Sequence, residues 1–308
     1  MTLRIITTVW APATATLPAG PYDLTSLANA HDELDIPAAD QTKDARLARY
    51  ITEASTDITS YCNRKFVVEG LTDLIYVDRA SLPPRRPAGA APLPLTRWPI
   101  ANVAILSTGT DTPSGAILPF GSTAGVAANY PVSGGGGGIN NGTLETGANI
   151  PANTTVASLV ANTSVTLSRS VLADVPASTP VTFGLSVWQL QSDGTLTGLV
   201  LNSDYTIDPD VGELFRLDQW GRLIAWEELP TSVAYYAGYA TVPSDVEGAA
   251  LRLLTNRWFA HGRDPALRER DHPVRGRETY WIGGPPKSGS LPEEVAGRLD
   301  RYRVRVAL

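Results

Sequence analysis

The chain is poor in the residues that build metal centres and thiol chemistry. Its 308 residues include one cysteine, Cys62, and three histidines, His31, His261 and His272, which lie far apart in the sequence. One cysteine forms no disulfide within the chain, and no histidine has a second ligand at the spacing of a zinc site. We therefore expect no metal, no cofactor and no cysteine–histidine catalysis. We expect each histidine to be a solvated or capping side chain.

Lysine and long apolar runs are also scarce. Lys43, Lys65 and Lys287 are the only lysines, so nearly every cation is an arginine, and the formal net charge is −6. Arginine makes planar, bidentate contacts with carboxylates and phosphates and is favoured at protein interfaces. No stretch approaches the roughly 18 apolar residues of a membrane-spanning helix, so we expect no membrane partner.

Charge almost disappears between residues 107 and 186, where Asp111, Glu145, Arg169 and Asp174 are the only charged side chains. The remainder is mostly glycine, alanine, serine, threonine, asparagine, proline and valine, without a helical period. Short runs of valine and threonine between turn residues predict a small module of β-strands.

Five consecutive glycines, Gly134–Gly138, lie inside this uncharged stretch. A phosphate-binding loop needs a lysine and a serine or threonine after its last glycine, and a dinucleotide-binding turn needs a strand before it and a helix after it. Both are missing, so the glycines indicate a linker that separates residues 107–133 from a compact β part, 139–186. The acidic pairs fit turns and helix starts, and no hydrolase, metalloprotease or kinase motif is present. We therefore expect no enzyme.

A long amphipathic helix is predicted over residues 40–66. Its apolar residues recur at steps of three and four, and its acidic start and basic end match the helix dipole. Cys62 falls on the apolar stripe and is expected to be a small core residue. The helix core, including a partner helix near residues 244–261, is expected to contain Leu47, Ile51, Ala54, Ile58, Tyr61, Leu253 and Trp258.

Three further helices have recognisable starts. Thr25 is expected to cap a short helix that stops before Pro37. Ser244 and Glu247 have the spacing of a capping box, which predicts a helix there. Pro292 is expected to occupy the first position of a last helix, which runs to the end of the sequence.

These patterns predict an α+β fold: a bundle of N- and C-terminal helices, a small antiparallel β-sheet and an inserted all-β module. The predicted segments are 1–106 (helices and first strands), 107–186 (inserted β module with a Gly-rich linker), 187–262 (strands and third helix) and 263–308 (extended arm and C-terminal helix).

Residues 263–290 are polar, rich in arginine and interrupted by proline and glycine. We interpret them as an exposed loop or an arm that orders on a partner. Aromatic residues among arginines, as at Tyr280 and Trp281, are typical of interface anchors. The same mixture could bind single-stranded nucleic acid by stacking, or the arginines could simply form a solvated face around Trp258 in the core.

Three segments follow one another in a recognisable order: residues 23–66, 233–265 and 290–304. The first carries the pattern D..L...I..AS..I..Y..R.F, the second begins VAYYAGYATVPSD, and the third reads SLPEEVAGRLDRYRV. Together they resemble the head–tail connector (adaptor) proteins of long-tailed bacteriophages, over about two thirds of the chain. The pattern residues of the first segment are Asp44, Leu47, Ile51, Ala54, Ser55, Ile58, Tyr61, Arg64 and Phe66.

The resemblance implies a structural virion protein without enzymatic activity. Such connectors form a dodecameric ring in the neck, between capsid and tail, after assembly in the host cytoplasm. The ring docks on the portal, extends the DNA channel and presents a surface to a stopper or tail-completion protein. Genomic double-stranded DNA passes through the lumen without specific binding, which the net charge of −6 suits.

In this family the C-terminal segment typically grips the portal. Carried to the matching positions, that role falls on the arm and the last helix. The residues expected to contact the portal are Arg268, Arg270, Arg275, Arg277, Tyr280, Trp281, Arg298, Arg301, Tyr302 and Arg305.

Residues 107–186 depart from the family pattern, which runs from one strand to the next without them. Part of this stretch resembles small β modules of phage structural proteins, which suggests a role in surface or partner contacts. Two other functions stay open: another oligomeric tail or baseplate adaptor, and a surface- or carbohydrate-binding protein that acts through the β module.

Overall fold

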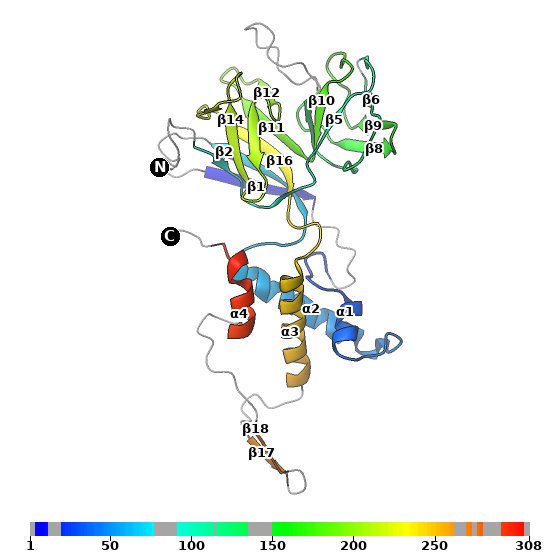
Figure 1. Cartoon of the computed structure of the whole chain (residues 1–308), viewed down its shortest axis with the longest axis vertical. Coiled ribbons are helices and arrows are strands. Elements are labelled where there is room, and N and C mark those ends of the chain that lie inside the picture. The colour runs from blue at the N-terminus through cyan, green and yellow to red at the C-terminus, as the bar shows by residue number, and fades with distance from the viewer. Residues whose placement is uncertain are drawn as a thin grey trace. The chain divides into compact units, whose positions relative to one another are not determined.

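The computed structural model describes residues 4–11, 20–76, 91–113, 115–134, 150–261, 269–272, 276–279 and 291–304. The chain forms two compact units (Figure 1). One, the β unit, consists of Met1–Pro12 and Val68–Gly238, and the other, the helical unit, consists of Ala13–Val67 and Tyr239–Leu308. Because the helices lie in one unit and most of the strands lie in the other, the predicted α+β class is confirmed.

The larger sheet of the β unit is antiparallel and six-stranded. Five strands follow the order β1-β2-β16-β11-β12, and β4 pairs with β16. The strands come from distant parts of the sequence, so the sheet is complete only when both chain segments of the unit have folded. Their bounds are β1 (Arg4–Ala11), β2 (Glu69–Tyr76), β4 (Ile100–Ala101), β11 (Leu185–Leu190), β12 (Leu196–Leu199) and β16 (Thr231–Ala237).

A second, four-stranded sheet shares its core with the first. It has the order β13-β14-β15, with β3 beside β14. Trp226, Tyr205 and Tyr235 are the largest fully buried side chains there, and the Trp226 indole donates to the Leu214 carbonyl at 3.2 Å. The strands are β3 (Leu93–Pro94), β13 (Tyr205–Asp208), β14 (Glu213–Leu217) and β15 (Leu223–Ile224).

Residues 104–183 build an all-β module with a core of its own. Two three-stranded sheets, β5-β10-β7 and β6-β9-β8, enclose valines, leucines and the edge-to-face pair Phe120–Phe183, whose ring centroids are 5.5 Å apart. Gly134 ends β7, and the rest of the glycine run, with the linker role predicted for it, lies outside the described residues. The strands are β5 (Ala104–Ser107), β6 (Ile117–Pro119), β7 (Val132–Gly134), β8 (Val156–Val160), β9 (Ser164–Leu167) and β10 (Pro180–Phe183).

In the helical unit, α2 packs against α1 and α3, and α3 packs against α4. The expected core residues Leu47, Ile51, Ala54, Ile58 and Leu253 are buried. Tyr61 and Trp258 are half-buried against the same clusters. The helices are α1 (Leu27–Glu33), α2 (Asp44–Cys62), α3 (Ser244–Ala260) and α4 (Glu293–Leu299), with 3-10 turns at Gln41–Lys43 and Asp300–Tyr302.

Two predicted helix caps are wrong. Ser26, not Thr25, caps α1 by accepting a hydrogen bond from the Asn29 backbone N–H at 3.1 Å. No side chain caps α3 at Ser244, and Glu247 instead accepts bonds from the Thr25 hydroxyl at 3.0 Å and the Asn29 amide at 2.5 Å. Tertiary hydrogen bonds between α1 and α3 therefore replace the local capping box.

Two predicted helix lengths are also wrong. The helix expected over residues 40–66 is shorter, because Asn63 adopts the left-handed conformation (φ 49°) and ends α2 at Cys62. Pro292 precedes α4 as its N-cap, and the regular helix ends at Leu299 before a single 3-10 turn.

Candidate partner-binding surface

Three aromatic rings meet at one end of the helical unit. The Phe66 centroid lies 6.1 Å from that of Tyr239 and 5.7 Å from that of Tyr302, and Tyr239 and Tyr302 are 6.3 Å apart. Each ring comes from a different one of the three segments described above, 23–66, 233–265 and 290–304. Aromatic pairs at such spacings stabilise a core beyond the area that they bury. This cluster therefore joins the three segments in space.

The C-terminal residues of the described chain are tied to the end of α2. The Tyr61 hydroxyl donates to Asp300 Oδ1 at 2.7 Å, and this bond raises the pKa of the Tyr61 phenol. Arg303 lies 5.0 Å above the Tyr61 ring, and the Val304 N–H donates to the Cys62 carbonyl at 2.9 Å. These contacts extend the aromatic cluster along the surface of the unit.

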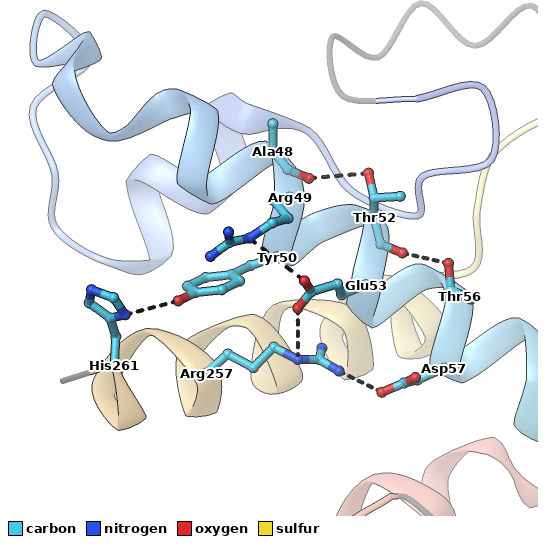
Figure 2. A network of polar contacts seen from close by, with 9 residues as sticks. All are labelled: Ala48, Arg49, Tyr50, Thr52, Glu53, Thr56, Asp57, Arg257 and His261. Atoms are coloured by element: carbon cyan, nitrogen blue, oxygen red, sulfur yellow. Dashed lines mark hydrogen bonds and ion pairs between the residues drawn. The ribbon is translucent and has the colours of Figure 1, made fainter. Parts of the chain in front are cut away.

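A second polar network joins α2 to α3 (Figure 2). Arg257 of α3 reaches between two carboxylates of α2: Nη2 lies 2.5 Å from Asp57 Oδ2, and Nε lies 3.7 Å from Glu53 Oε2. At the end of α3, His261 Nδ1 lies 3.3 Å from the Tyr50 hydroxyl. The network is partly exposed and holds the two longest helices in register.

Two of the expected portal-binding arginines lie on the surface of the last helical turns. Arg298, in α4, lies 3.7 Å from the Glu294 carboxylate one turn away. Arg301 pairs with Asp245, and its guanidinium lies 4.8 Å from the ring of the half-buried Tyr302. Both arginine side chains are more than half exposed, so a partner can reach them.

The arm contains regular structure that the sequence does not predict. β17 (Glu269–His272) and β18 (Gly276–Thr279) form an antiparallel ladder that places Arg270 opposite Glu278 and Arg277 opposite Asp271. Cross-strand pairs of opposite charge favour such a ladder, so the expectation of an irregular loop is wrong for these two segments. The side chains of Arg270 and Arg277, and all of Arg268, Arg275, Tyr280, Trp281 and Arg305, lie outside the described part of the structure.

His31 is neither solvated nor a cap, contrary to the prediction. It is buried, and its Nε2 lies 2.7 Å from Asp44 Oδ1, so the imidazole links α1 to the start of α2. A pocket of about 360 Å³ lies beside this pair. The Asp44 carboxylate and the His31 imidazole in its lining already bind each other, so this pair has a structural role. The pocket is lined by Leu27, Ala28, His31, Asp32, Ile36, Ala38 and Asp44.

Within the described ranges, no group of three histidine, cysteine or carboxylate side chains could hold a metal ion. No helix in those ranges has the length and apolar character needed to cross a bilayer. The surface features that remain for function are the aromatic cluster, the arginines of the last helical turns and the arm.

Comparisons with known proteins give limited matches. No family model and no curated protein matches the chain. Two solved structures align with 100% of this chain and 98% of their own: "Neck of empty GTA particle computed with C6 symmetry", at 16% identity and a TM-score of 0.35, and "Virion of native gene transfer agent (GTA) particle", at 13% identity and a TM-score of 0.36. At these TM-scores the similarity assigns neither fold nor function.

Proposed function

We propose that this chain is a structural virion protein that forms a head-to-tail connector ring in the neck of a phage-like particle. The observation that carries the proposal is the mutual contact of Phe66, Tyr239 and Tyr302. Of the three segments that resemble connector proteins, the first ends more than a hundred residues before the second begins. Their packing into one core supports a single inherited unit rather than three chance matches.

The portal is the proposed partner of the arm and the last helix. Exposed arginines beside aromatic rings, as at Arg301 and Tyr302, have the composition of interface anchors. The ion pairs that these arginines make within the chain are exposed and therefore weak, so a portal carboxylate can replace them at small cost. Repetition around a ring multiplies modest contacts into tight binding.

The proposed ring contains about twelve copies, as the resemblance implies, and leads double-stranded DNA toward a stopper or tail protein. DNA must slide through the lumen, and phosphate contacts with arginine would slow it. The net charge of −6 is consistent with a bore lined by carboxylates. A ring structure with arginines along the bore would contradict this part of the proposal.

The experiment compares portal binding by two matched quadruple variants. One replaces Arg268, Arg270, Arg275 and Arg277 with alanine, which leaves the helical core unchanged. The control replaces the exposed Arg49, Arg169, Arg222 and Arg252 with alanine. Mass photometry and sedimentation with purified portal from the same particle measure affinity and copy number.

We expect wild type and control to bind the portal as a ring, and the arm variant to lose affinity on the order of 100-fold. An arm variant that binds like wild type would overturn the role of the arm. A wild-type chain that stays monomeric, ignores the portal and binds glycans would overturn the function itself and favour a surface-binding protein.

A further inference from the structure

The six-stranded sheet has one face turned away from the core that it shares with the second sheet. Alternate residues of a strand point to opposite faces, and Val187, Val233 and Tyr235 point into the core. Their neighbours in sequence therefore lie on the outer face. The register places Ile6, Leu74, Ser232, Trp188 and Gly198 in one row across this face, from β1 to β12.

Part of this outer face is already covered by the β module. Tyr236 of β16 lies 4.9 Å from Tyr130, and the Ser133 hydroxyl donates to the Leu185 carbonyl at 3.1 Å. Trp188, on the same face, is also buried. We call the uncovered remainder the open face, and its one charged side chain among the described residues is Arg4. The open face consists of Arg4, Ile6, Thr72, Leu74, Tyr76, Leu190, Leu196 and Ser232.

Large apolar side chains lie exposed on the open face. Ile6, Tyr76, Leu190 and Leu196 are each 40–41% exposed. The described charged side chain on this face is Arg4, whose guanidinium lies 5.9 Å from the Tyr76 ring centroid. Largely apolar patches of this kind on a sheet are characteristic of surfaces that another protein covers.

The module carries a sheet face with no charged side chain among its described residues. In β6-β9-β8, Leu118 and Val165 point into the module core, so the alternate residues point outward. Ile117 is 58% and Val160 is 59% exposed. We call this surface the module face: Ile117, Pro119, Ser158, Val160, Ser164 and Thr166.

Two of the described charged residues of the module make hydrogen bonds to backbone groups that are not part of the module face. Arg169 donates to the Ala152 carbonyl at 3.0 Å, and Asp111 accepts from the Ala177 N–H at 2.7 Å. Soluble domains normally protect sheet surfaces with lysine or glutamate. The module face has no such protection.

We propose that the open face of one copy packs against the module face of the next copy. The inference rests on the proposed function in that it names the contact between neighbours in the ring. A highly charged partner would leave unpaired, desolvated charges against either face, whereas Arg4 is the only charged side chain among the described residues of these two faces. Because the two faces differ, the contact is head-to-tail, and a rotation that repeats it closes a ring.

Disulfide trapping tests this contact in the full-length chain. Ile6→Cys and Val160→Cys place one thiol on each face, at positions exposed enough to tolerate the change. The native Cys62 is buried and does not interfere. Oxidation of the mixed variants, with and without portal, should shift monomer to disulfide-linked dimer, while each variant alone should stay monomeric.

The control pair combines Ile6→Cys with Leu223→Cys, an exposed position on the second sheet. A mixed dimer no more abundant than in this pair would overturn the proposal, as would dimers formed by one variant alone, which indicate identical faces meeting across a two-fold axis. Ile117→Glu added to Val160→Cys should abolish the mixed dimer, and its persistence would contradict the assigned face. Failed trapping with intact portal binding removes this interface only, whereas loss of both removes the proposed function.

Discussion

The Tyr235 hydroxyl donates a 2.7 Å hydrogen bond to Oδ2 of Asp73, whose side chain has no exposed surface. The same carboxyl group accepts from the Thr96 N–H at 2.8 Å and from the Thr7 hydroxyl at 2.7 Å. Burial, together with Asp73, raises the pKa of the Tyr235 phenol, so it remains a donor. One acceptor therefore joins β1, β2, β16 and the segment after β3.

Asp73→Ala should destabilise the β unit by roughly 2 kcal/mol, because it removes the acceptor of the buried Tyr235 hydroxyl and of two partly exposed donors, Thr7 and Thr96. Tyr235→Phe removes one donor and leaves Asp73 two others, so about 1 kcal/mol is expected. Denaturant unfolding followed by tryptophan fluorescence measures both. Equal losses in the two variants would contradict the idea that Asp73 organises the network.

Gly184 and Gly194 offer a matched test of backbone conformation and space. Both have positive φ, +83° and +84°, but a Cβ at Gly184 would lie 2.0 Å from the Asn102 carbonyl oxygen, whereas Gly194 has nothing within 4 Å. Gly194→Ala should cost about 1 kcal/mol for the left-handed conformation alone. Gly184→Ala should cost at least about 3 kcal/mol or prevent folding, because the clash adds to that strain. Thermal melts would distinguish the two, and similar melting temperatures would contradict the prediction.

The Arg257–Asp57 pair should contribute measurably to the stability of the helical unit. Its side chains are 27% and 34% exposed, so the pair is less screened than a surface pair. A double-mutant cycle with Arg257→Met and Asp57→Asn should give a coupling of about 1 kcal/mol. The control is Arg298–Glu294, in which both side chains are 57% exposed and the coupling should be close to zero. Additive single effects at Arg257 and Asp57 would contradict the prediction.

Cys62 should be protected from thiol reagents. Burial raises the pKa of its thiol to about 11. A cysteine in the unfolded chain ionises near pH 8.5, so the unfolded state loses this proton first, and the stability should fall as the pH rises from about 8.5 to 11. At pH 8 we expect labelling of the native protein to be on the order of 1,000-fold slower than in denaturant.

The matched variant is Cys62→Ala. Because it has no thiol to ionise, its free energy of unfolding should fall less than that of the wild type as the pH rises above about 8.5. Measuring the free energy of unfolding from pH 7 to pH 11 in both proteins isolates the contribution of the thiol. Rapid, stoichiometric labelling of the native chain would show that Cys62 is accessible, and identical pH profiles would show that folding does not raise the pKa of its thiol.

The local sequence predicts helices well where an apolar stripe is long. Residues 44–62 repeat apolar side chains at helical steps, and α2 forms there. Helix starts are less predictable, because their hydrogen bonds depend on distant residues. Glu247 lies 222 residues from Thr25, and no local pattern reveals that these side chains meet.

The candidate surface is predictable only in its parts. The three motif segments can be read from the sequence, whereas the contact of Phe66 with Tyr239 and Tyr302 depends on how the helices pack. Sequence reasoning assigns no role to Tyr239, although Tyr239 is the tyrosine of the AGY motif in the second segment. The pairing of His31 with Asp44 is hidden for the same reason, since it requires α1 to fold back onto α2.

The first and last residues of the β module, Ala104 and Phe183, lie side by side because they are cross-strand partners. Such partners have Cα atoms about 5 Å apart, a gap that a tight turn spans. A single recombination event could therefore add, delete or replace the whole module without changing the order of the other strands. In evolutionary terms the module is a cassette, and lineages that share the helical unit could carry different cassettes at this point.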